Sequence, residues 1–159
     1  MIDERERLLH RLHAVLRIER LSAVCYETHA DRARASGHRR MAQALHEMAQ
    51  SHDRHCRELA SRIAELGGDP QGAPLHEELI ANTSCWPDDD DMCSAFEIDL
   101  RAEDSEIEAY QVLLRQSDAH TASLCEDAIA EDRQHLRWLR EQLFRGLELP
   151  LPEENLPEP

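Results

Sequence analysis

Four long segments of this chain carry apolar residues at the three- and four-residue spacing of an α-helix, and this period constrains the fold most strongly. The segments run from about residue 3 to 35, 38 to 66, 89 to 116 and 119 to 144. Short breaks at Gly37 and at Ser117-Asp118 join them in pairs. The pattern predicts an all-α fold built from two antiparallel helical hairpins.

The two hairpins are separated by residues 67–89, a stretch rich in Pro, Gly, Asn and Asp. A connection this long can cross a bundle ~45 Å tall at ~3.3 Å per residue, so the second and third helices can lie parallel. We expect one domain over residues 1–146, with a short helical turn near 75–80. The acidic run 88–91 is interpreted as a helix cap. The Pro- and Glu-rich tail, 147–159, is expected to be extended or disordered.

The charge, the apolar runs and the cysteine count exclude several classes of function. The formal net charge of −15 argues against a nucleic-acid partner, because such a surface repels phosphates. No apolar run approaches the ~20 residues that a membrane span needs, and the charged N-terminus lacks a signal-peptide pattern. We therefore expect a cytoplasmic protein without a membrane partner. The five cysteines are an odd number, which favours small buried thiols over a disulfide framework.

Each apolar stripe is interrupted once, and always by side chains that bind metal ions. The first and third helices contribute one Glu each, whereas the second and fourth contribute pairs spaced i and i+3, which share a helix face. The interrupting residues are Glu19, His52, His55, Glu103, Asp132 and His135.

These side chains are also predicted to lie at one depth in the bundle. Glu19 precedes Gly37 by 18 residues, and the pair of histidines on the second helix follows it at a similar distance. Glu103 and the pair on the fourth helix flank Ser117-Asp118 in the same way. Burying six polar groups without partners would be very costly. The arrangement therefore predicts a metal site at mid-bundle.

The same Glu-to-Tyr spacing occurs on the first and the third predicted helix. Tyr26 follows Glu19 by seven residues, and Tyr110 follows Glu103 by seven. A pseudo-two-fold bundle would bring each Tyr within two turns of a carboxylate, where it either supports a ligand through a hydrogen bond or packs in the core. Glu106, one turn after Glu103, is a further candidate beside the site.

In these features the chain resembles members of the ferritin-like superfamily, and bacterioferritins in particular. The similarity spans about residues 5–145 and rests on the spacing of Glu19, Tyr26 and His29, on RIAELGG, on Asp99-Leu100-x-x-Glu103 and on EDRQHLRWL. It implies a four-helix bundle with a di-iron centre held by a Glu from two helices and Glu-x-x-His from the other two.

The chain departs from that family pattern at several positions. His52 stands where the family has a bridging Glu, and Asp132 replaces the other bridging Glu, with Glu131 as an alternative. Asp53 replaces a haem-ligating Met, so haem is not expected. We expect no fifth helix in the Pro-rich tail, which argues against a closed 24-subunit cage and leaves a homodimer as the expected assembly. The resemblance implies two iron ions, but a nitrogen-rich site also admits zinc, manganese or copper.

Three functions follow from this pattern. The first is a ferroxidase-type oxidoreductase that oxidises Fe(II) with O₂ or peroxide. The second is a non-enzymatic metal buffer or sensor with an altered or mononuclear site. The third is a structural bundle whose site has decayed. The other histidines are expected mostly on the surface: His10, His13, His29, His38, His46, His76 and His120.

Overall fold

The computed structural model describes residues 3–72 and 92–144. Its helices are α1 (Glu4–Ala35), α2 (Arg39–Glu65), the short 3-10 helix η1 (Pro70–Gly72), α4 (Met92–Leu114) and α5 (Ala119–Phe144). No strand occurs within these ranges, which confirms the all-α prediction. The expectations for residues 75–80, 88–91 and 147–159 lie outside the described residues.

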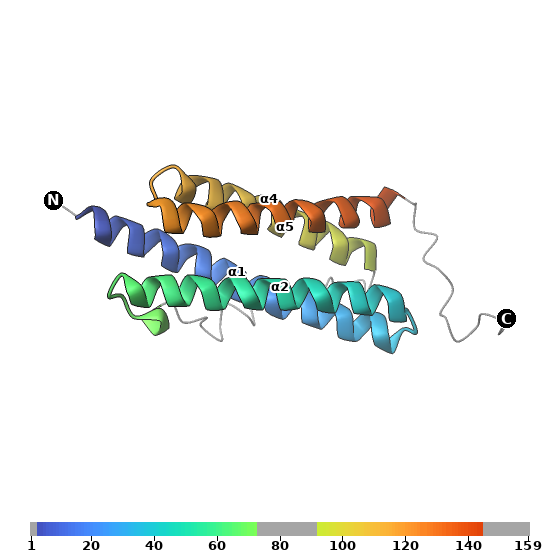
Figure 1. Cartoon of the computed structure of the whole chain (residues 1–159). Helices are drawn as coiled ribbons and strands as arrows, with labels where there is room; N and C mark the ends of the chain where they lie inside the picture. Colours follow the sequence, from blue (N-terminus) through green and yellow to red (C-terminus); the bar gives the residue numbers. More distant parts are fainter. Residues whose placement is uncertain (1–2, 73–91, 145–159) are drawn as a thin grey trace.

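The four long helices form a bundle of two hairpins (Figure 1). Helix α1 runs antiparallel to α2, and α4 runs antiparallel to α5, while α2 and α4 run in the same direction. This is the topology predicted for a bundle whose hairpins are joined by a long crossover.

Both helices of the first hairpin end in a left-handed glycine. At Gly37, with φ of 80°, the amide of His38 bonds the carbonyl of Ala33 at 2.8 Å, and the amide of Gly37 bonds Arg34 at 3.1 Å. Gly67, with φ of 73°, repeats the arrangement at the end of α2. This pairing satisfies the last carbonyl groups of the helix. It stops α1 sharply and allows α2 to fold back.

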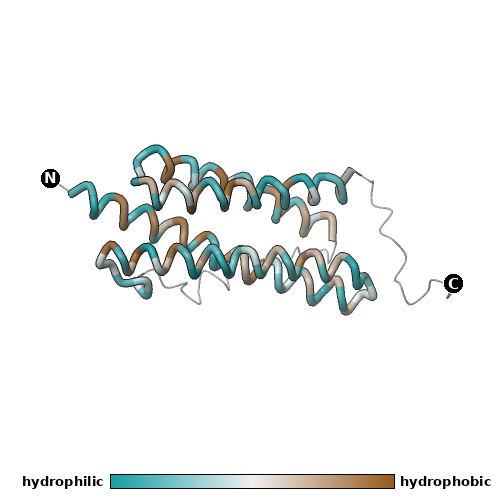
Figure 2. The backbone as a smooth tube through the Cα atoms, in the orientation of Figure 1, coloured by the Kyte–Doolittle hydropathy of each residue, from teal (hydrophilic) through white to brown (hydrophobic). Residues whose placement is uncertain are grey.

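Apolar residues recur at intervals along every helix, and the tube in Figure 2 changes between teal and brown accordingly. Their side chains form two separate apolar clusters. One contains Leu12, Val15, Leu16, Leu59, Ile63, Tyr110, Leu113, Cys125, Ala128 and Ile129. The other contains Tyr26, Ala30, Ala33, Met41, Ala42, Leu45, Met48, Ala49, Met92, Phe96 and Leu139. The core therefore comes in two parts, with a tyrosine in each.

The described helices include none that combines the length and the apolar character required to cross a bilayer. The cysteine prediction is correct for Cys125, a buried free thiol, and wrong for Cys25, which is disulfide-bonded. The Cys56 and Cys93 thiols are half-buried and form no disulfide bond. An odd cysteine count argues against a complete framework of disulfides, but it does not exclude a single bond.

Candidate metal centre

A layer of ionisable side chains lies in the bundle core, and all six residues predicted from the interrupted stripes are in it. Glu19, His52, Glu103 and Asp132 are fully buried, and His55 and His135 are at most 9% exposed. Their donor atoms fall into two groups that share His52, with the atoms of each group within 4.8 Å of one another. One group is Glu19, His52 and His55; the other is His52, Glu103, Asp132 and His135.

Glu19 and Glu103 are the two anchors of this layer. The Tyr110 hydroxyl donates to Oε1 of Glu19 at 2.5 Å, and Nδ1 of His55 lies 3.2 Å from the same atom. The Tyr26 hydroxyl donates to Oε1 of Glu103 at 2.6 Å. Each carboxylate thus has a tyrosine from the opposite hairpin and a histidine beside it. The seven-residue spacing predicts a Tyr near each carboxylate, and in the structure each Tyr bonds the carboxylate of the opposite hairpin.

His52 lies between the anchors and joins the two halves of the layer. Its Nδ1 is 2.7 Å from Oε2 of Glu19, and its Nε2 is 3.3 Å from Oε1 of Glu103. The ring stacks on Tyr26 with centroids 5.1 Å apart. Both ring nitrogens can donate to carboxylates only when the imidazole is protonated. A divalent cation that binds here would displace that proton.

The electrostatics of the layer follow from burial and from this hydrogen bonding. Burial alone would raise the pKa of Glu19, but its hydrogen bonds to His52 and His55 outweigh that effect and lower it to about 2. Burial opposes a charge on His52, yet Glu106, Glu103 and Glu19 raise its pKa well above the ordinary value.

The pKa of Asp132 shifts in the opposite direction to that of Glu19. Burial, followed by the negative charges of Glu103, Glu106 and Glu19, raises the pKa of Asp132 to about 10. Burial also raises the pKa of Glu106 well above its ordinary value. Without a cation the layer therefore stores protons on these two acids, and a metal ion would replace them.

Several buried polar atoms of the layer have no hydrogen-bond partner among the described residues. They are His55 Nε2, Glu103 Oε2, Glu106 Oε2, and both Asp132 oxygens. An unpaired buried polar atom typically costs about 1–3 kcal/mol, so a cluster of them needs a compensating ligand. Carboxylate and imidazole groups suit iron, zinc and manganese. The residues present therefore fit a metal centre.

Glu131, the alternative to Asp132, does not enter the layer. Its side chain is 35% exposed, accepts hydrogen bonds from Ser51 and Arg54, and lies 3.5 Å from Nε2 of His55. Of these two acids on α5, Asp132 is therefore the one that belongs to a donor group in the core.

The expectation that His29 lies on the surface is wrong. His29 is fully buried, and its Nδ1 lies 2.8 Å from Oδ2 of the buried Asp99. The signal was present in the sequence, because His29 follows Tyr26 by three residues and so lies on the same helix face. Burial raises the pKa of Asp99, while the hydrogen bond to His29 opposes that rise.

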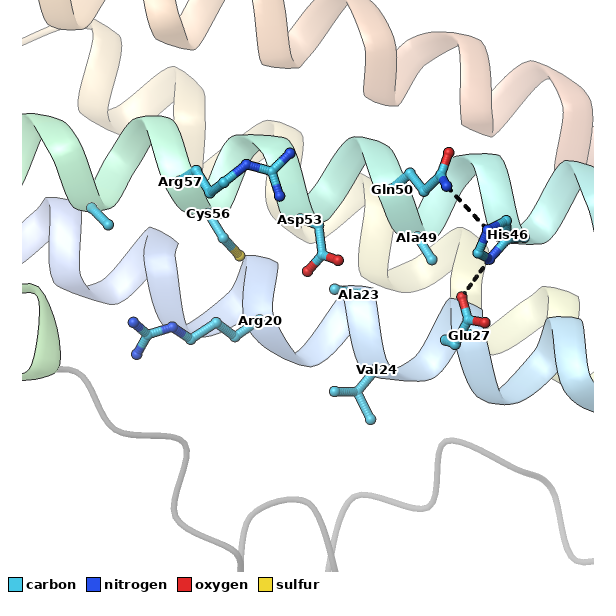
Figure 3. Close-up of a pocket in the computed structure, with 11 residues that line it drawn as sticks. Arg20, Ala23, Val24, Glu27, His46, Ala49, Gln50, Asp53, Cys56 and Arg57 are labelled. Atoms are coloured by element: carbon cyan, nitrogen blue, oxygen red, sulfur yellow. Dashed lines mark hydrogen bonds and ion pairs between the residues drawn. The ribbon is translucent and has the colours of Figure 1, made fainter.

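Asp53, at the position compared with a haem-ligating Met, faces a different part of the molecule. It lines a surface groove of about 790 Å³ between α1 and α2, together with Arg20, Cys56 and His46. Figure 3 shows His46 between Glu27 and Gln50 in this groove, with Nδ1 of His46 2.7 Å from the Glu27 carboxylate. The groove is separate from the buried layer, and the expected absence of haem stays a prediction.

The fold and the layer together define a helical bundle with a carboxylate- and histidine-lined core. The family model of the ferritin-like domain matches residues 9–146, and this chain belongs to that family. Among curated protein sequences, none matches the chain at a significant level.

Two similar solved structures are bacterioferritins. That of Desulfovibrio desulfuricans, described with its di-iron site in different catalytic states, is 23% identical with a TM-score of 0.79, covering 96% of this chain and 88% of that one. That of Rhodobacter capsulatus, described with a metal-free dinuclear site and haem iron, is 21% identical with a TM-score of 0.74, covering 86% and 82%. At these identities the likeness establishes the fold.

Proposed function

We propose that this chain binds two divalent metal ions in the buried layer, and that its physiological metal is iron, which it oxidises from Fe(II) with O₂. The observation that carries the proposal is the set of buried polar atoms of the layer that make no hydrogen bond within the described chain. They come from three helices, and all but Oε2 of Glu106 belong to residues of the two donor groups that share His52. Membership of the ferritin-like family and the likeness to two bacterioferritins support it further.

The proposed ligands are Glu19, His52 and His55 for one ion and Glu103, Asp132 and His135 for the other. With iron bound, each Fe(II) would give up one electron and become Fe(III), and the two electrons with two protons would reduce O₂ to hydrogen peroxide.

The side chains around the proposed ions hold the ligand carboxylates in place and release protons when the ions bind. The Tyr26 and Tyr110 hydroxyls hold Glu103 and Glu19 in place from the opposite hairpin. The protons on His52 and Asp132 leave these side chains when the cations enter. The surrounding apolar clusters limit the access of water to the layer.

A mononuclear zinc site is the second candidate. Glu19, His52 and His55 form a group of one carboxylate and two imidazoles, a donor set that suits four-coordinate zinc with one open position. In that case the protein would act as a metal buffer or sensor, and the bound ion would be inert to O₂.

Anaerobic titration of metal-free protein with Fe(II), followed by exposure to air, tests the proposal. We expect two ions per chain and oxidation faster than in protein-free buffer. Binding of fewer than two ions, or oxidation at the buffer rate, would contradict it. Glu19→Gln should slow iron oxidation to the rate in protein-free buffer. Glu108→Gln changes an exposed position on α4 and should leave the oxidation rate unchanged.

We also propose that the chain works in the cytoplasm as a homodimer and not as a closed 24-subunit cage. The candidate pairing surface is the α1–α2 groove, whose lining includes the exposed Val24 and the alanines Ala23, Ala49 and Ala60. Sedimentation velocity tests the assembly: a dimer-sized species is expected, and a cage-sized species would overturn the proposal.

A further inference from the structure

Glu106 is a buried carboxylate that the six-residue ligand set leaves without a role. It lies on α4 one turn after Glu103, and its side chain is fully buried. Its Oε1 accepts a hydrogen bond from the Ser22 hydroxyl on α1. Its Oε2 has no hydrogen-bond partner among the described residues. One oxygen is therefore held in place while the other is left available.

The available oxygen points toward the centre of the layer. Oε2 of Glu106 is 3.8 Å from Nδ1 of His52, the nitrogen that also lies 2.7 Å from Glu19. A cation that took the place of the proton between His52 and Glu19 would lie close to Glu106.

The internal two-fold of the chain gives Glu106 a specific meaning. The series Glu19, Ser22, Tyr26 on α1 corresponds to Glu103, Glu106, Tyr110 on α4. Ser22 and Glu106 are thus equivalent positions, and they bond to each other across the bundle. The first hairpin carries a serine where the second carries an additional carboxylate.

The same two-fold relates His52 of α2 to Asp132 of α5. The first hairpin therefore lacks a carboxylate at His52, and the second has one more at Glu106. Glu19, Glu103 and Asp132 carry three negative charges when ionised, one fewer than two divalent cations require. Glu106 restores the balance, because it adds the fourth.

We propose that Glu106 is a direct ligand of the metal centre, supplying from α4 the carboxylate that α2 lacks, and that Ser22 orients it. This inference rests on the proposed dinuclear centre. It predicts that the ion on the side of Glu19 and His52 depends on a residue of the opposite hairpin.

The test uses Co(II) as an optical probe and the isosteric variant Glu106→Gln. Metal-free wild-type protein and variant are titrated anaerobically, and both the number of ions and the absorption bands are recorded. We expect the wild type to bind two ions. The variant should bind one of them at least about 10-fold more weakly, and its Co(II) absorption bands should differ from those of the wild type. The exposed Glu108→Gln serves as the matched control and should behave as wild type.

Two further variants separate a ligand from a packing group. Glu106→Asp keeps the charge but withdraws it by one methylene, and should also weaken one ion. Ser22→Ala should weaken the same ion to a smaller extent. Two ions bound by Glu106→Gln with wild-type affinity and bands would overturn this inference and leave the proposed function intact. A wild type that binds no Co(II) would overturn both.

Discussion

The Tyr26 hydroxyl on α1 donates a hydrogen bond of 2.6 Å to Glu103 on α4, and this contact joins the two hairpins at the centre of the core. Its counterpart runs the other way, from Tyr110 on α4 to Glu19 on α1 at 2.5 Å. Each hairpin therefore positions the principal carboxylate of the other. The polar layer holds the bundle together as well as forming a candidate site.

Replacement of either tyrosine tests this relationship. A hydrogen bond to a charged acceptor contributes about 1.5–3 kcal/mol, so Tyr26→Phe and Tyr110→Phe should each lower the free energy of unfolding of metal-free protein by that amount. Urea denaturation at neutral pH measures it. Because the two contacts are equivalent, the variants should lose similar amounts; a loss below about 0.5 kcal/mol in both would show that the contacts do not support the fold.

The stability of metal-free protein should fall as pH rises. Burial raises the pKa of Asp132 to about 10 in the folded chain, above its ordinary value of 3.8. The stabilisation is therefore complete below pH ~4 and is lost progressively as pH rises toward about 10. The raised pKa of His52 acts in the same direction.

Urea denaturation between pH 5 and pH 9, at constant ionic strength, measures this dependence. Asp132→Asn removes the titrating group and should flatten the decline. A decline of equal slope in wild type and variant would show that Asp132 is ionised in the folded protein across this range.

Metal ions should stabilise the protein, and their removal should not unfold it. The apolar clusters on both sides of the layer hold the bundle together without a ligand. A metal ion at 100 times its dissociation constant adds about 2.7 kcal/mol. Thermal denaturation with a chelator, and then with stoichiometric Fe(II) under argon, compares the two states. Identical melting temperatures would favour the structural bundle with a decayed site.

The end of α1 offers a prediction independent of the centre. Gly37 has φ of 80°, a conformation that costs a residue with a side chain about 1–2 kcal/mol. Gly37→Ala should destabilise the protein by that amount in urea denaturation. Gly72→Ala is the matched control, because Gly72 is not among the positive-φ glycines of the described chain. Equal effects of the two changes would contradict the cap.

The helices and the layer could be predicted from the sequence because both follow from the three- and four-residue spacing of side chains along a helix. Spacing of three and four residues fixes the face of a helix, and distance from a turn fixes the depth. Helix α5 begins and ends where the pattern predicts. The side chains of Glu19 and Asp132 each lie in a donor group with His52 in the core.

The partners of each side chain could not be predicted in the same way. Periodicity places His29 and Glu106 on inward faces, but it does not say that Asp99 lies opposite one and Ser22 opposite the other. Those contacts depend on how α1 and α4 pack, over a separation of 70 residues or more. The disulfide at Cys25 is likewise a matter of tertiary distance.

A crystal structure of Fe(II)-loaded protein, with anomalous scattering measured on both sides of the iron absorption edge, tests directly whether the buried layer binds two iron ions. We expect two iron peaks in the buried layer, one beside Glu19 and His55 and the other beside Glu103 and His135. An anomalous map with no peak in that layer, in crystals grown from protein saturated with Fe(II), would contradict it.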